Sequence, residues 1–193
     1  MKKILLLLAN GFEAYEASVF TDVLGWNQLE GDGSTVVVTV GMHPLLQATW
    51  NFQVTPEMLT TDLNLDDFDA LAIPGGFEEA NFYEDAFSQT FGHIIRHFDK
   101  QNKPIASICV ASLAVAHSGV LNGRSATTYN HPTSKRLAQL ATYGVNVVKE
   151  RIVIDDNIIT SSNPSTAMEV AFILLEMLTS TENTAKVKEL MGY

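Results

Sequence analysis

Short, uninterrupted apolar runs recur along this chain of 193 residues, and most of them alternate with segments of helical spacing. A continuous apolar run is typical of a strand buried on both faces, and alternation of such strands with helices favours a parallel sheet. We expect strands at 4–9, 35–40, 68–73, 104–108, 125–128, 145–148, 152–154 and 158–160, with further short strands within 46–55. We expect helices at 16–28, 84–100, 110–118, 134–141, 163–178 and 181–191. The predicted fold class is α/β, with helices on both faces of a mostly parallel sheet.

The composition limits the partners that the chain is expected to have. It contains 12 Lys and Arg against 22 Asp and Glu, a net charge of −10. Nucleic acids and anionic membranes bind basic surfaces, so we expect neither as a partner. The apolar run at 4–9 is shorter than a signal-peptide core of ~7–15 residues, and no run approaches the ~18–20 residues of a membrane span. We therefore expect one cytoplasmic domain over 1–193. The charge balance itself says little about a small neutral substrate.

The residues that are best suited to binding or catalysis follow three of the expected strands. They are the loop at 10–16, the turn Pro74-Gly75-Gly76, and Cys109, which is the only cysteine and therefore forms no internal disulfide. Sites in parallel sheets lie at the carboxyl ends of the strands. A thiol at the start of a helix faces free N–H groups and the positive end of the dipole, which favours a thiolate with a pKa below the usual ~8.5.

Developing negative charge beside such a thiolate would need hydrogen-bond donors. The Gly75-Gly76 turn has no side chains to obstruct it, so its N–H groups can face a substrate, and the N–H of Val110 is a second candidate donor.

Segments 11–16, 68–76, 103–109, 123–128 and 160–166, taken in this order, resemble the DJ-1/PfpI superfamily, whose fold is shared with class I glutamine amidotransferases. The resemblance covers nearly the whole chain. It implies a flavodoxin-like sandwich, usually a homodimer, with a reactive cysteine at a strained nucleophile elbow. That cysteine would be Cys109, with Glu16 bonded to its sulfur and with Gly76 and Val110 as oxyanion donors.

The expected hydrogen bond between Glu16 and Cys109 requires that the pKa values of both groups shift. A carboxylate would repel a thiolate, so Glu16 must be neutral and donate its proton to the sulfur. Its pKa must then rise while the pKa of Cys109 falls, and the two titrations are coupled. Glu13 lies three residues earlier and is the rival acid. The family spacing from Gly11 favours Glu16.

The chain also departs from the family pattern. Members with claimed peptidase activity have a His directly after the cysteine, where this chain has Val110, so a peptidase of that kind is not expected. In DJ-1-like members a His follows the Thr-Thr pair. Here Thr127-Thr128 is followed by Tyr129, Asn130 and His131, which leaves His131 as an acid/base candidate and Tyr129 as the alternative occupant of that space.

No phosphate-binding or serine-hydrolase motif is found, and His93 and His97 are not accompanied by a third metal ligand. We therefore expect neither a cofactor nor a metal.

Three functions are compatible with this sequence. The first is an enzyme in which the Cys109 thiolate adds to a small electrophilic carbon, as an amidase or other hydrolase, a hydratase or a glyoxalase-like enzyme. The second is a redox-sensing stress protein in which Cys109 is oxidised and Glu16 stabilises the product. The third is a non-catalytic interaction module with an inert cysteine. The enzyme is the leading hypothesis.

Overall fold

The computed structural model describes all residues from Met1 to Tyr193, and its centre is a seven-stranded sheet with the order β10-β11-β7-β6-β1-β2-β5. Neighbouring strands are parallel except for the β10–β11 pair at one edge. The strands are β1 (Lys2–Leu8), β2 (Thr35–Gly41), β5 (Met58–Leu59), β6 (Ala70–Ile73), β7 (Ile105–Ser107), β10 (Ile152–Asp155) and β11 (Ile158–Ser161). Two small sheets lie outside it, formed by β3 (Leu46–Gln47) with β4 (Gln53–Val54) and by β8 (Ser125–Ala126) with β9 (Asn146–Val147).

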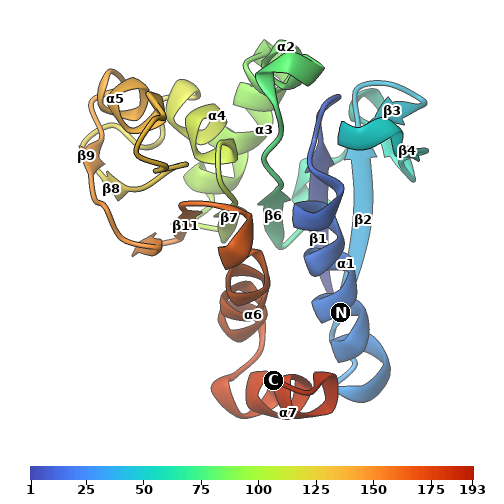
Figure 1. Cartoon of the computed structure of the whole chain (residues 1–193). Coiled ribbons are helices and arrows are strands. Elements are labelled where there is room, and N and C mark those ends of the chain that lie inside the picture. Colours follow the sequence, from blue (N-terminus) through green and yellow to red (C-terminus); the bar gives the residue numbers. More distant parts are fainter.

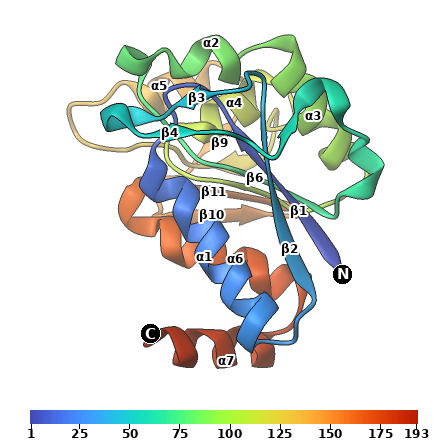
Figure 2. The ribbon, with the colours of Figure 1, turned by 90° about the vertical axis from the view of Figure 1, so that its right-hand side faces the viewer.

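Helices form a layer on each side of this sheet (Figures 1 and 2). One layer contains α1 (Ala14–Glu30), α6 (Ala167–Leu178) and α7 (Thr181–Met191), which pack on one another. The other contains α2 (Phe82–Ala86), α3 (Gln89–Lys100), α4 (Ala111–His117) and α5 (Arg136–Ala141). This arrangement confirms the predicted three-layer α/β sandwich. None of the helices combines the length and the apolar character that crossing a bilayer requires.

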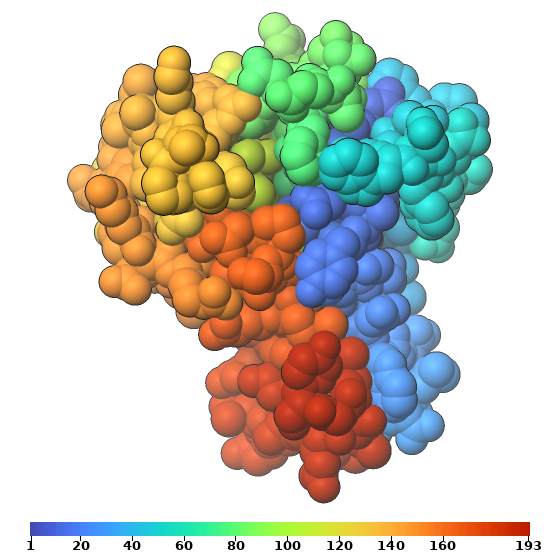
Figure 3. All heavy atoms as spheres, in the orientation of Figure 1, coloured from blue at the N-terminus to red at the C-terminus, as the bar shows by residue number.

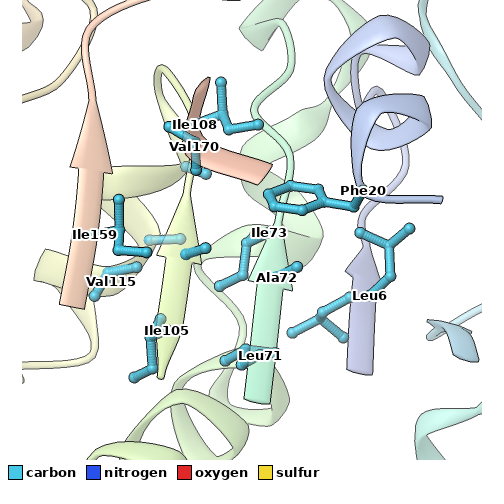
Figure 4. Close-up of a cluster of buried hydrophobic side chains, with 14 of the residues drawn as sticks. Leu6, Phe20, Leu71, Ala72, Ile73, Ile105, Ile108, Val115, Ile159 and Val170 are labelled. Atoms are coloured by element: carbon cyan, nitrogen blue, oxygen red, sulfur yellow. The ribbon is translucent and has the colours of Figure 1, made fainter. Parts of the chain in front are cut away.

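The apolar runs are uninterrupted because both faces of the central strands are covered. Every residue from Ile4 to Leu8 is at most 1% exposed. Figure 4 shows side chains of the helical layers, such as Phe20 of α1 and Val115 of α4, gathered around those of the central strands, such as Leu71 and Ile159. This core fixes the strands whose ends carry the site.

Two elements differ from the sequence prediction. The single helix expected at 84–100 is two helices, α2 and α3, because Ser88 begins a new helix: its Oγ accepts a hydrogen bond from the N–H of Phe91 at 3.2 Å. The short edge strand β5 was not expected, since two residues are too few to give a periodic signal.

The order β7-β6-β1 brings the three chemically interesting strand ends together. In Figure 1 these ends lie away from α7 and the C-terminus. The loops after β1 and β6 are also tied directly to each other. The N–H of Glu13 donates to the carbonyl of Gly75 at 2.8 Å, and the N–H of Phe77 donates to the carbonyl of Gly11 at 3.1 Å. The turn after β6 is thus fixed against the start of α1.

Candidate active site

Cys109 occupies a strained turn between β7 and α4. Its φ angle is +56°, in the left-handed region that is costly for residues other than glycine. Two buried hydroxyl groups hold its carbonyl oxygen: Thr128 Oγ1 donates to it at 3.0 Å and Ser112 Oγ at 3.2 Å. Strain of this kind persists only where the surroundings impose it. The geometry therefore matches the nucleophile elbow that the sequence predicted.

Glu16 lies in the first turn of α1 and is completely buried. One of its oxygens, Oε2, accepts a hydrogen bond from the N–H of Gly75 at 2.6 Å, and the carboxyl is close enough to the Cys109 thiol to change the pKa of both groups. Its other oxygen, Oε1, is buried and has no well-formed hydrogen bond. Burial and the neighbouring charge of Glu13 raise the pKa of Glu16 to about 8, although the Gly75 N–H and the thiol oppose this rise. Glu16 is therefore mostly neutral at pH 7.

The pKa of the Cys109 thiol does not follow the sequence prediction. Burial raises it, and a charged Glu16 raises it further, while the N–H of Val110 lowers it. The helix that follows has only seven residues, and its N-terminal N–H groups do not compensate for the loss of solvent. The predicted fall in the thiol pKa is thus wrong, whereas the predicted rise for Glu16 agrees with its buried position.

Gly76 and Val110, which line the pocket with Cys109, have N–H groups that no backbone oxygen accepts. The Val110 N–H points to the sulfur closely enough to affect its pKa. The N–H of Gly75, in contrast, is used by Glu16. Gly76 also has to be glycine, because a Cβ there would clash with the Phe82 ring and with the carbonyl oxygen of Gly11.

Cys109 opens into a pocket of about 590 Å³. Figure 3 looks onto the face where the green, gold and orange segments around residues 80, 130 and 165 meet over this region. The lining residues come from the segments that follow β1, β6, β7, β8 and β11, including the starts of α2 and α5: Glu13, Gly76, Phe77, Glu78, Glu79, Tyr83, Cys109, Val110, Tyr129, Thr133, Ser134, Lys135, Arg136 and Pro164. The rival acid Glu13 therefore lines the pocket, while Glu16 lies behind the cysteine.

The structure separates the two residues expected after the Thr-Thr pair. Tyr129 lines the Cys109 pocket, but His131 does not. His131 is exposed, its Nδ1 lies 2.8 Å from Thr133 Oγ1, and it lines an adjoining pocket of about 400 Å³ with Asn130 and Asn163. Tyr129 and Pro164 are common to both pockets. Tyr129 thus occupies the space nearer the cysteine.

Two pocket residues were not singled out from the sequence. Arg136 begins α5, and its guanidinium lies over the ring of Tyr83 at 5.1 Å from the ring centre. The Tyr83 hydroxyl is buried without a partner, and burial raises the pKa of Tyr83 above its usual value. No local motif marks either residue, because their proximity depends on the packing of α2 against the segment that leads into α5.

Comparisons with known proteins agree with this fold. The model of the DJ-1/PfpI family matches residues 2–177. Protein dj-1beta of Drosophila melanogaster is 31% identical over 186 residues, which cover 96% of this chain and 94% of that protein. The crystal structure of Drosophila DJ-1beta superposes with a TM-score of 0.84 at 29% identity and covers 98% of this chain and 97% of that one.

A plant relative, DJ-1 homolog B of Arabidopsis thaliana, is 30% identical over 188 residues. This match covers 96% of the chain but only 40% of the plant protein, so the chain spans less than half of that relative. The match of the family model and the full-length similarity to the Drosophila protein lead to one conclusion. The chain belongs to the DJ-1/PfpI family.

Proposed function

We propose that this protein is a cysteine-dependent enzyme that adds the Cys109 sulfur to a small electrophilic carbon, without a cofactor. The observation that carries this proposal is the meeting of three features at one pocket. A strained cysteine opens into the pocket, a buried acid with a pKa of about 8 contacts the cysteine, and two N–H groups that no backbone oxygen accepts line the same pocket. A purely structural cysteine would require none of the three.

The proposed reaction begins from the form of the Cys109–Glu16 pair that holds one proton. As sulfur bonds to the carbonyl carbon, the Glu16 carboxylate takes the thiol proton and the π electrons of the C=O bond move to oxygen. The N–H groups of Gly76 and Val110 donate to the resulting oxyanion. Glu16 then returns the proton to that oxygen, which gives a thiohemiacetal from an aldehyde. With an amide, the proton goes to the leaving nitrogen, and water hydrolyses the thioester.

The pocket limits the class of substrate. A volume of about 590 Å³ suits a small molecule. Val110 occupies the position at which peptidase-type members carry a histidine, and a valine side chain cannot act as a base. We therefore favour amidase, hydratase or glyoxalase-like chemistry over peptide hydrolysis.

The direct test is turnover of a panel of short aldehydes, primary amides and isocyanides. We expect activity on at least one class, its loss in Cys109→Ala, and a decrease of about 10²-fold or more in Glu16→Gln, the typical contribution of general acid–base catalysis. Ser118→Ala is a suitable control, because Ser118 is a buried hydroxyl at the far end of α4. Equal turnover by wild type and Cys109→Ala would refute the proposal.

The contact between the sulfur and a carboxyl also supports a second function, redox sensing. A protonated Glu16 can donate a hydrogen bond to an oxygen added to Cys109, so peroxide would convert the thiol to sulfenic and then sulfinic acid. Mass spectrometry after graded peroxide should then show gains on the order of 16 and 32 Da confined to Cys109. If methionines oxidise first and Cys109 stays unmodified, redox sensing is excluded.

A further inference from the structure

Arg136, Tyr83 and Glu78 form one wall of the pocket. The guanidinium of Arg136 there already binds a carboxylate of the protein itself, that of Glu78. Arg136 Nη2 donates to Glu78 Oε2 at 2.6 Å, and Arg136 Nη1 donates to Gln139 Oε1 at 2.8 Å. The guanidinium carbon also lies over the Tyr83 ring, 5.1 Å from its centre, which is a third contact that holds the group in place. A guanidinium held in this way is a preformed receptor for a carboxylate.

The carboxylate bound there belongs to an exposed side chain. The Glu78 side chain is 63% exposed, whereas that of Arg136 is 26% exposed. Glu78 is on the short 3₁₀ turn Glu78–Ala80, so its side chain can rotate into water without disturbing a helix or strand. Ion pairs with an exposed partner contribute little to stability, so exchanging Glu78 for another carboxylate costs little.

The same wall contains a hydrogen-bond donor with no partner. The Tyr83 hydroxyl is buried and unbonded, and burial keeps it protonated. Charges on Arg136 and on Cys109 both affect the pKa of Tyr83, which places its hydroxyl within electrostatic reach of the guanidinium and of the sulfur.

We propose that the Cys109 pocket selects substrates that carry a carboxylate close to the electrophilic carbon, and that this carboxylate displaces Glu78 from Arg136. The inference deepens the proposed function and rests on it. Arg136 is then a specificity-determining residue, and Glu78 is an internal competitor for its guanidinium. The other charged residues that line the pocket are Glu13, Glu79 and Lys135, so Arg136 is its only guanidinium.

The test uses two alkylating reagents of nearly equal size, iodoacetate and iodoacetamide, which differ in carrying a carboxylate or an amide. Cys109 is the only cysteine, so each reagent reports on this pocket alone. The measured quantity is the ratio of the two second-order rate constants at low salt. In Arg136→Met this ratio should fall by about tenfold, because a charge-assisted contact is lost. In Glu78→Gln it should rise several-fold, because the competing carboxylate is gone.

Two matched variants distinguish a specific contact from a general change of charge. Glu79→Gln removes a pocket carboxylate that does not bond Arg136, so it should change the ratio less than Glu78→Gln. Arg124 is equally exposed and is paired with Asp99, and Arg124→Met should leave the ratio unchanged.

The proposal is wrong if Arg136→Met keeps the wild-type ratio, or if Glu78→Gln and Glu79→Gln raise it equally. Should Arg136→Met fail to fold, Glu78→Gln decides the question by itself. The ratio requires no turnover. If no substrate is turned over but the ratio responds as expected, only the proposed enzyme function fails; if turnover occurs but the ratio does not respond, only the selectivity for carboxylates fails.

Discussion

At the scale of single residues, the Cys109–Glu16 pair is governed by burial. Both side chains are removed from water, which disfavours the negative form of each, and their proximity disfavours two negative charges further. The pair therefore holds two protons at neutral pH and loses the first near pH 8. The sequence predicted the neutral acid but not the raised pKa of the thiol, because the degree of burial at the elbow has no local signature.

The raised pKa of Glu16 predicts how stability depends on pH. Its value is about 8 in the folded protein and near 4.5 in an unfolded chain, so between these values the folded state binds more protons. The stabilisation that the folded protein gains because Glu16 keeps its proton is complete below pH 4.5 and is lost as pH rises through 8. We expect the free energy of unfolding to fall by an amount on the order of a few kcal/mol over this range, at about 1.4 kcal/mol for each unit of pKa difference.

Urea denaturation at several pH values between 5 and 9 measures this effect. Glu16→Gln should flatten the profile, because glutamine has no proton to lose. Glu30→Gln, an exposed change at the other end of α1, should keep the wild-type slope. A wild-type profile as flat as that of Glu16→Gln would mean that Glu16 is already ionised in the folded protein.

The same pair predicts the pH dependence of Cys109 alkylation. Reaction needs the form that has lost one proton, so the rate with iodoacetamide should rise with an inflection near pH 8. In Glu16→Gln that inflection should disappear, and the rate should follow the buried thiol alone. An unchanged inflection in the variant would assign it to a group other than Glu16.

At the scale of secondary structure, the sequence predicted elements best where burial was uniform. β1 was predicted as a continuous apolar run, and its residues from Ile4 to Leu8 are all buried because both faces of the strand are covered. The break between α2 and α3 was missed because apolar spacing continues across it, and only the hydroxyl of Ser88 marks the new start. Prediction from a periodic pattern therefore fails where a single cap divides a long amphipathic segment.

The elbow between β7 and α4 depends on a hydrogen bond that can be tested. Thr128 Oγ1 donates to the carbonyl of Cys109, and Thr128→Val removes this donor while keeping the shape of the side chain. We expect a loss of about 1–2 kcal/mol in unfolding free energy, since a buried acceptor loses a partner. Alkylation of Cys109 should also slow, because the left-handed turn is less well fixed.

Thr127→Val is the matched control for this change. Thr127 is adjacent and equally buried, but its hydroxyl has no hydrogen-bond partner. Removing an unsatisfied buried hydroxyl should be neutral or slightly stabilising. Denaturation and alkylation curves that are the same for both valine variants would show that the Thr128 hydroxyl does not hold the elbow.

At the scale of the whole molecule, the site is an assembly of loops from distant parts of the chain. Cys109 and Gly76 could be predicted because each follows a strand whose end must meet its neighbours at one edge of a parallel sheet. The same argument placed the loop at 10–16 there, but the choice of Glu16 over Glu13 came from the family resemblance. Tyr83 and Arg136 could not, because their contact depends on how the loop after β8 folds back over α2. His131 lies on that same loop, and the sequence could not indicate that it faces an adjoining pocket instead.

Exposed apolar side chains also concern the whole molecule. We expect those beside the pocket to form the interface of the homodimer that the family resemblance implies. Trp50, Phe52 and Leu45, on and beside the β3–β4 hairpin, are 78%, 58% and 52% exposed. Trp50 also makes an edge contact with Phe77, a residue of the Cys109 pocket. Aromatic residues are enriched at the centres of interfaces, so Trp50→Glu should weaken self-association by about tenfold or more.

Analytical ultracentrifugation over a range of concentrations measures this directly. The wild type should sediment with twice the chain mass, and Trp50→Glu should shift toward the monomer. Ile154→Glu tests an apolar residue of 50% exposure on β10, at the opposite edge of the sheet from β5, and should leave the mass unchanged. A wild-type mass of one chain at every concentration would rule out the dimer. A dimer that withstands Trp50→Glu would place the interface on another face.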